Sequence, residues 1–173
     1  MTQMDLPPRV GERPRATATL PHSQLDQQPA STRDLDSVLA EAATWPHVEM
    51  RPSRIAVEGS RALVLTDVAD IGPTEAFMID REFCHGHAGG DSSLHAALPP
   101  HLARAAQHAG WGEPHYLVHT GQAPPSITML YAPRDEAERD AILRLVRASY
   151  EFALGVIDDS DSNSDSNSNS KVP

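Results

Sequence analysis

The sequence contains little cysteine and few aromatic residues, and each shortage excludes a class of protein. Among its 173 residues there is one cysteine, Cys84, and only 5% are Phe, Trp or Tyr. A single thiol cannot form an intrachain disulfide framework or a cysteine-rich zinc module. Apolar runs are also short: none approaches the roughly 18 residues of a membrane helix, and residues 1–30 lack the apolar core of a signal peptide. These shortages predict a cytoplasmic protein that does not enter the membrane.

Positive charge is scarce as well. The chain has 24 acidic and 14 basic side chains, which gives a net charge of −10 with histidine neutral. A negative surface repels phosphate, so neither nucleic acid nor an anionic membrane is an expected partner. The remaining expectation is a small-molecule ligand or substrate.

Two common catalytic motifs are missing. No Gly-x-Ser-x-Gly elbow is present, which disfavours a Ser-His-Asp hydrolase of that type. The one glycine-rich turn, residues 88–91, is too short for a phosphate-binding loop and precedes an expected strand. Cys84 lies in an expected strand, where a lone cysteine is most often an inert core residue.

The composition divides the chain into three parts. Residues 1–33 contain five prolines and no apolar period, which predicts a disordered arm. Residues 156–173 include a stretch of only Asp, Ser and Asn, which predicts a disordered acidic tail. Residues 34–155 remain for one modest domain, and we expect that both flanking parts can be deleted without unfolding it.

Within residues 34–155 the apolar period alternates between helix and strand. Helices are predicted from Leu35 to before Pro46, from Pro99 to Gly110, and from Asp135 onward, the last with a capping-box start. Strands are predicted over residues 53–57, 61–66, 75–79, 82–87, 92–98, 115–118 and 126–131. This order predicts an α+β fold: an antiparallel sheet of about five to seven strands with helices packed on one face.

Histidine is the residue type that points to chemistry. The chain has nine histidines, and six of them fall within residues 85–115: His85, His87, His95, His101, His108 and His115. Because side chains alternate along a strand, His85 and His87 share one face while Gly86 faces the other. His95 joins that face if His87 pairs with Ser93 in the hairpin, and it faces away if His87 pairs with Ser92. The sequence leaves both registers open.

Three interpretations of this cluster remain open. Histidines with nearby carboxylates, such as Glu82, Asp91 and Glu113, can form a metal-free acid/base pocket. His85, His87 and His95 can alternatively ligate Zn or non-haem Fe with open coordination positions. The histidines can also be purely structural, each satisfied by a carboxylate or by the backbone.

Several blocks of the sequence together resemble the luciferase-domain family, which is named for fungal luciferases that oxidise a hydroxylated hispidin with molecular oxygen. The resemblance is best over residues 75–155. The blocks are Glu82-Phe-Cys-His85-Gly-His87, Asp91-Ser-Ser-Leu-His95, Leu98-Pro99, Gly110-Trp111-Gly112-Glu113-Pro-His115 and Tyr131-Ala-Pro-Arg134.

The resemblance implies a small α+β domain with oxygenase-like chemistry on an aromatic or pyrone-like molecule. It implies molecular oxygen as co-substrate and no tightly bound organic cofactor, with bound Zn or Fe as the alternative. We expect no membrane-anchoring N-terminal segment like that of luminescent members, and Pro114 stands where the resemblance implies a basic residue. We therefore expect no light emission.

Two functions from different classes follow. The first is an oxidoreductase, here a monooxygenase-like enzyme; the alternative is a non-catalytic small-molecule-binding or interaction module. The candidate catalytic residues are Glu82, His85, His87, His95 and His115. The candidate substrate-binding residues are Trp111, Glu113 and Tyr131.

Overall fold

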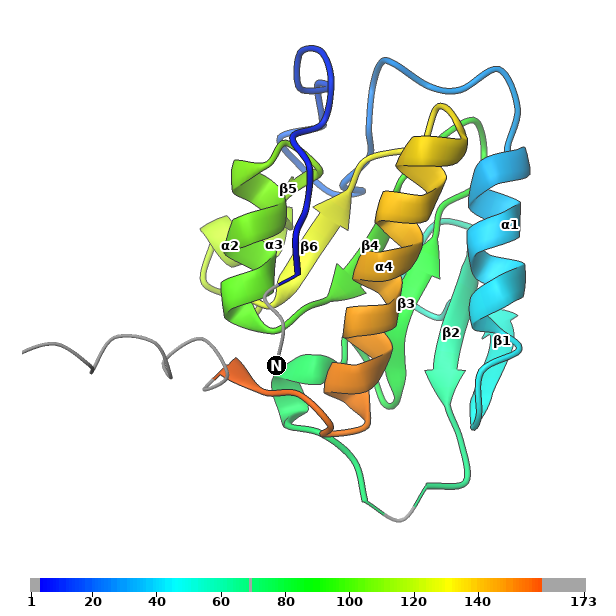
Figure 1. The fold of residues 1–173 in the computed structure, drawn as a ribbon, viewed down its shortest axis with the longest axis vertical. Coiled ribbons are helices and arrows are strands. Elements are labelled where there is room, and N and C mark those ends of the chain that lie inside the picture. The colour runs from blue at the N-terminus through cyan, green and yellow to red at the C-terminus, as the bar shows by residue number, and fades with distance from the viewer. Residues whose placement is uncertain (1–3, 69, 160–173) are drawn as a thin grey trace, which may run out of the picture.

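The computed structural model describes residues 4–68 and 70–159, and its centre is a six-stranded antiparallel sheet (Figure 1). The strand order is β1-β2-β3-β4-β6-β5. The strands are β1 (Val48–Pro52), β2 (Arg61–Leu65), β3 (Glu82–Gly86), β4 (Leu94–Ala97), β5 (Gly112–Pro114) and β6 (Ile127–Leu130). The predicted α+β fold with an antiparallel sheet is confirmed.

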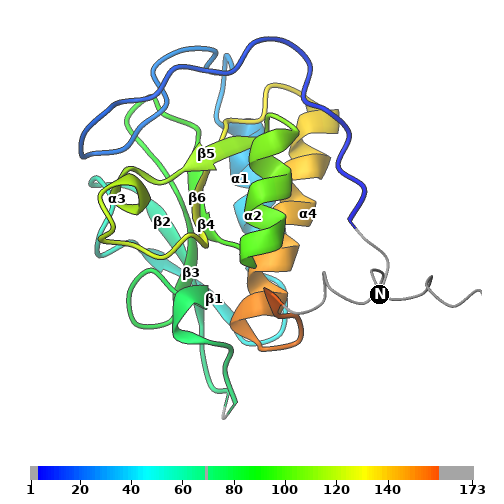
Figure 2. The same ribbon diagram turned by 90° about the vertical axis from the view of Figure 1, so that its left-hand side faces the viewer.

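The helices lie on both sides of this sheet, but the longest three share one side. The helical elements are α1 (Arg33–Ala42), the 3₁₀ turn η1 (Thr74–Ala76), α2 (Pro100–His108), α3 (Tyr116–His119) and α4 (Glu136–Ala153). Figure 2 shows α1, α2 and α4 on one side of the sheet and the short α3 on the other. The side of the sheet away from the three long helices is therefore left partly open for a site.

Helix α4 begins and packs as its sequence pattern predicts. The Asp135 side chain accepts a hydrogen bond of 2.9 Å from the Glu138 backbone N–H, which caps the first turn. Its apolar stripe, including Ile142, Leu145 and Val146, is fully buried. This stripe joins the apolar face of α1 and the inner side chains of β2, β3 and β4 in one core.

Three predicted strands are wrong, and local hydrogen bonds explain two of the errors. Residues 53–57 form a loop in which Ser53 Oγ accepts from the N–H groups of Ile55 and Ala56, and the strand lies earlier, at β1. Residues 115–118 belong mostly to α3, where His115 Nδ1 accepts from the Leu117 N–H and caps the turn. Residues 75–79 contain the end of η1 rather than a strand.

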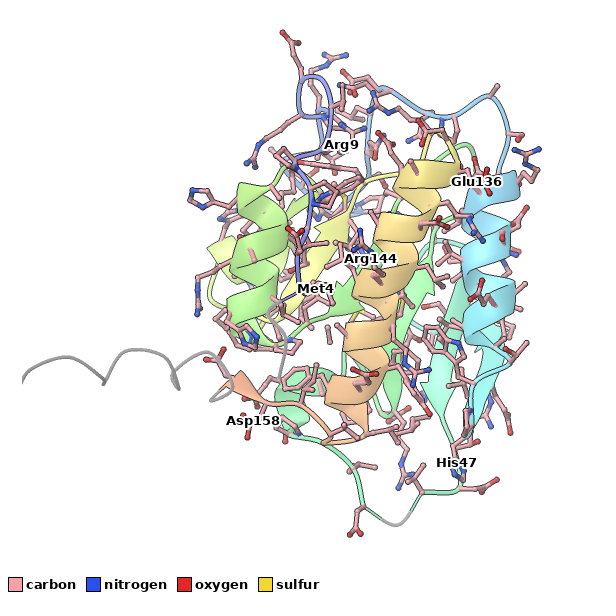
Figure 3. All side chains as sticks on the ribbon, viewed as in Figure 1. Met4, Arg9, His47, Glu136, Arg144 and Asp158 are labelled. Carbon is pink, nitrogen blue, oxygen red and sulfur yellow. The ribbon has the colours of Figure 1, made fainter. Side chains whose placement is uncertain are left out.

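The N-terminal segment, residues 4–32, lies along the domain, which differs from the disordered arm expected from its composition. It passes from the long-helix side over one end of the sheet to the opposite side (Figure 2). The segment has no periodic apolar face, and polar contacts fix its position instead. Pro7 O accepts from Trp111 Nε1 at 2.7 Å, and Gln24 Oε1 accepts from the buried Ala132 N–H at 2.8 Å. In Figure 3, Met4 and Arg9 mark its start, between α2 and α4.

The tail expected over residues 156–173 falls almost entirely outside the described residues, which end at Asp159. Within residues 4–68 and 70–159, no helix has the length and apolar character needed to cross a membrane.

Candidate functional site

Three histidines meet on the sheet face away from α1, α2 and α4. His85 of β3 pairs directly with His95 of β4, and the His87 N–H donates to Ser93 O at 3.0 Å. This is the register in which His87 pairs with Ser93, so His95 shares a face with His85 and His87. Gly86 faces the other way, and a Cβ built there would lie 2.7 Å from a methyl carbon of Leu39 on α1. The close approach of α1 therefore favours glycine between the two histidines, because a larger residue there would displace the end of the Leu39 side chain.

The three imidazoles converge on one nitrogen. His95 Nδ1 lies 3.0 Å from His85 Nε2 and 3.1 Å from His87 Nε2. The rings of His85 and His87 both stand edge-on to the ring of His95, at 90° and 76°. All three side chains are at least 94% buried.

A carboxylate lies behind each of the two β3-side histidines. Glu82 Oε1 is 2.6 Å from His85 Nδ1, and Asp91 Oδ2 is 2.9 Å from His87 Nδ1. An ionised carboxylate only accepts hydrogen bonds, so the proton of each of these imidazoles lies on Nδ1. Nε2 of His85 and of His87 therefore carries an unshared electron pair that points toward His95. Carboxylate partners of this kind fix the tautomer and ring orientation of metal-ligating or proton-accepting histidines.

A fourth histidine, His22, enters from the N-terminal segment. His22 Nδ1 lies 3.4 Å from His95 Nε2, and the two rings are stacked at 5.5 Å between centroids. His22 Nε2 lies 3.1 Å from Glu113 Oε1, and Tyr131 donates its hydroxyl hydrogen to the other Glu113 oxygen at 2.9 Å. Sequence reasoning missed His22, because the segment that carries it has no periodic pattern to place it.

His115 completes the group at the edge of the sheet. Its ring centroid is 4.4 Å from that of His95, and its Nδ1 accepts from the Leu117 N–H at 3.1 Å. Since Nδ1 accepts, the proton of neutral His115 lies on Nε2. Burial, together with the neighbouring His22, His85 and His87, lowers the pKa of His115 to about 4.

Burial keeps the centre of the cluster neutral. It lowers the pKa of His95 well below the usual range, and the surrounding histidines add to this effect. Burial also lowers the pKa of His85, although the hydrogen bond to Glu82 opposes it. Neutral imidazoles are available as proton acceptors and as metal ligands at neutral pH.

The outer carboxylates stay ionised. Burial opposes the ionisation of Asp91, but hydrogen bonds with His87 and Ser93 outweigh it and hold the pKa of Asp91 at about 2. Burial likewise opposes the ionisation of Glu113, and hydrogen bonds with His22 and Tyr131 nevertheless lower its pKa. Negative charge therefore surrounds a neutral centre.

The histidines line a cavity of about 660 Å³ with mostly apolar walls. The polar lining includes five imidazoles: His22, His85, His87, His95 and His115. The apolar walls include Leu20, Ile55, Val57, Phe77, Met78 and Leu117. These walls come from the N-terminal segment, the loop after β1, the turn before β3, and α3.

Other candidate residues lie behind the cavity lining. Trp111 is buried in the core with its indole N–H donated to Pro7, while Glu113 and Tyr131 reach the cluster through His22. His101 is apart from the cluster and contacts Asp159. The Cys84 thiol is fully buried in the core, and burial raises its pKa, so it is an inert thiol rather than a nucleophile.

Among residues 4–68 and 70–159, two overlapping sets of three nitrogen donors are close enough to hold a metal ion. One set is His85, His87 and His95, and the other is His22, His95 and His115; within each, the donor atoms lie within 4.8 Å of one another. Both sets contain His95, whose two ring nitrogens face opposite groups. A neutral imidazole has one unshared pair, so His95 can serve one set at a time.

The fold and the site together define a class of protein: a small α+β domain with a buried histidine cluster that lines an apolar-walled cavity. Residues 80–149 match the family model described as the luciferase domain. The chain is 30% identical over 161 residues to a luciferase of Armillaria ostoyae and 31% identical over 163 residues to one of Armillaria mellea. It is also 30% identical over 159 residues to a luciferase of Neonothopanus nambi.

The resemblance to the luciferase-domain family that the motifs suggested is confirmed, and the family model covers residues 80–149. Each of these alignments includes 84% of this chain and spans 60% of the length of the fungal luciferase. No solved structure gives a significant match to the chain.

Proposed function

We propose that this chain is a non-luminescent oxidoreductase of the oxygenase type, which oxidises a small aromatic or pyrone-like molecule with molecular oxygen. The observation that carries the proposal is the convergence of five imidazoles on one apolar-walled cavity. The resemblance to a family that includes fungal luciferases supports an oxidation of this kind.

The cavity suits a small, flat, largely apolar molecule with one ionisable hydroxyl. Its volume of about 660 Å³ falls within the range of small-molecule pockets. Phe77, Met78 and Leu117 offer apolar contacts to a ring, while the histidines gather on one side. An enolic or phenolic hydroxyl directed at that side would meet the unshared pairs on His85 and His87.

Those pairs suit the removal of a proton. In the proposed reaction the substrate O–H bond breaks, and its proton moves to Nε2 of His85 or His87, whose Nδ1 protons are held by Glu82 and Asp91. The resulting enolate gives an electron pair to molecular oxygen, so that a C–O bond forms and a peroxide anion results. The imidazolium returns its proton to give a hydroperoxide, and no outside reductant is consumed. His115, which also lines the cavity, would donate its Nε2–H to the developing anion.

The test is oxygen consumption by the purified full chain with a panel of 4-hydroxy-2-pyrones and phenols. We expect uptake with at least one member and no light emission. His87→Ala should lower the rate by about 10²–10⁴-fold, the usual contribution of a general base. His108→Ala is the matched control, because His108 is an exposed histidine on α2. Saturable binding of a panel member without oxygen uptake would instead favour a non-catalytic binding module.

A further inference from the structure

The nitrogen atoms around His95 carry too few protons to form all the hydrogen bonds that their positions allow. Three nitrogens face this ring: His85 Nε2 at 3.0 Å, His87 Nε2 at 3.1 Å and His22 Nδ1 at 3.4 Å. His85 Nε2 and His87 Nε2 carry unshared pairs, because each of these rings has its proton on Nδ1 and donates it in a hydrogen bond to Glu82 or Asp91.

His22 Nδ1 also carries an unshared pair. Its other nitrogen, Nε2, faces the Glu113 carboxylate, which fixes the proton there, and the Tyr116 N–H points at Nδ1 from 3.4 Å. Neutral His95 therefore has one proton for three acceptors on its two sides.

Whether the His95 proton lies on Nδ1 or on Nε2, at least one buried nitrogen of the cluster is left facing another unshared pair. With the proton on His95 Nδ1, the Nε2 atom of His95 faces His22 Nδ1, whose unshared pair is directed at the Tyr116 N–H, so His95 Nε2 receives no hydrogen bond from His22. With the proton on Nε2, His22 is satisfied, but three unshared pairs converge between His85, His87 and His95. One additional proton on His85 would occupy the single pair on His95 Nδ1 and still leave His87 opposed. Buried unshared pairs that face one another are costly, so this arrangement favours a positively charged partner between the three nitrogens.

We propose that His85 Nε2, His87 Nε2 and His95 Nδ1 bind one divalent cation that prefers imidazole, such as Zn²⁺ or Fe²⁺. A cation uses all three converging pairs and leaves the His95 Nε2–H free to donate to His22. Zn–N bonds of about 2.0–2.1 Å at tetrahedral angles place two nitrogens about 3.3 Å apart. The N···N distances of 3.0 and 3.1 Å need only a small expansion to reach that spacing.

The charges beside the three ligands and the position of the ligands on the cavity wall both support a bound cation. Glu82 and Asp91 each contribute one negative charge directly behind a ligand, which together balance a 2+ ion bound by three neutral rings. The three ligands line the cavity, so a water or a substrate oxygen can take the fourth position. The site does not depend on the oxidation proposed above. Where both hold, the three nitrogens would bind the cation instead of a proton, the cation would stabilise the substrate oxyanion, and the proton of the substrate hydroxyl would be released to water.

The experiment uses the full chain after chelator treatment, titrated with Co²⁺ alone while the visible absorption of the ion is recorded. We expect intense bands typical of a near-tetrahedral site, saturating at one equivalent, and their loss when Zn²⁺ is added. Elemental analysis of the protein before chelation tells which metal it acquires in the cell.

Two variants and one control complete the test. His87→Ala should weaken Co²⁺ binding by about 100-fold or more, because removing a ligand exceeds the effect of losing an outer partner. Glu82→Gln keeps a hydrogen-bond acceptor for His85 and should weaken binding about 10–100-fold, which provides a readout even where the alanine variant fails to fold. His108→Ala should bind as the unchanged chain does.

Failure of this inference can be told from failure of the proposed oxidation. A chelated wild-type chain that binds no Co²⁺ saturably, or variants that bind as His108→Ala does, would overturn the metal site. Oxygen uptake by a chain that binds no Co²⁺ would leave the oxidation standing alone. Tight Co²⁺ binding without oxygen uptake on any substrate would leave the metal site standing alone.

Discussion

Gln24 shows how much one polar residue of the N-terminal segment contributes. Its side-chain oxygen accepts from the buried Ala132 N–H at the end of β6, and its side-chain amide donates to Asp26 O. Replacement by alanine leaves the Ala132 N–H without that partner in a site closed to water. Gln24→Ala should cost about 1–3 kcal/mol of unfolding free energy, measured by urea denaturation. Gln122→Ala, at the cavity mouth, is the comparison and should change stability by less than about 0.5 kcal/mol.

The histidine cluster also shows which parts of the site the sequence predicts and which parts it does not. The shared face of His85 and His87 follows from strand alternation, and the structure confirms it. The face of His95 depended on a register that the sequence left open, because the turn of residues 88–91 fits either pairing. His22 was beyond prediction, since a residue 91 positions away from Glu113 is placed only by the three-dimensional course of its segment.

Among the elements, the long helices and the central strands were predictable, whereas three short runs and the edge strand β1 were not. Helices α1 and α4 have enough apolar repeats for the pattern to select one structure, and the pattern also predicts strands β3 and β4, although not their register. Residues 53–57 and 115–118 are apolar runs of four or five residues, where one side-chain hydrogen bond decides between strand and turn. Strand β1 escaped prediction because it is an edge strand with mostly exposed side chains.

Helix α4 offers the direct test of how the core is built. Leu145 is fully buried in the stripe that faces the sheet and α1. Leu145→Ala should destabilise the domain by about 2–5 kcal/mol, because a lost side chain also leaves a cavity. Asp140→Ala, an exposed position of the same helix, should shift the urea midpoint little. Equal effects of the two changes would mean that α4 docks through another face.

Strand β5 depends on a glycine for its approach to β6. A Cβ built at Gly112 would lie 2.2 Å from the backbone oxygen of Met129, whereas one at Gly86 would meet the movable end of the Leu39 side chain. Gly112→Ala should therefore displace β5 and lower the melting temperature far more than Gly86→Ala. Because β5 carries Glu113 toward His22, the same change should also loosen the cavity. Similar melting temperatures for the two variants would contradict this ranking.

For the molecule as a whole, the N-terminal segment acts as part of the domain. It supplies backbone acceptors to Trp111 and Arg144, a buried Arg9 beside Glu138, and the imidazole of His22. Deleting residues 1–32 should lower the unfolding free energy by several kcal/mol, at about 1 kcal/mol for each hydrogen bond lost. Deleting residues 160–173 is the control, and we expect it to leave the melting temperature unchanged. Composition alone suggested that residues 1–33 and 156–173 could both be deleted without unfolding the domain.

The course of that segment also has a consequence for the order of folding. Its first residues leave the ribosome early, yet Pro7 and Gln24 bond to groups 104 and 108 positions later in the chain. Contacts between residues so far apart carry a large loop-closure entropy and form slowly. The sheet and its helices can associate from more local contacts, so the cavity should acquire its last wall at the end of folding. In pulsed hydrogen exchange during refolding, the Ala132 amide should become protected later than the amides of α4, and a nascent chain should remain unable to hold a ligand until synthesis has passed β6.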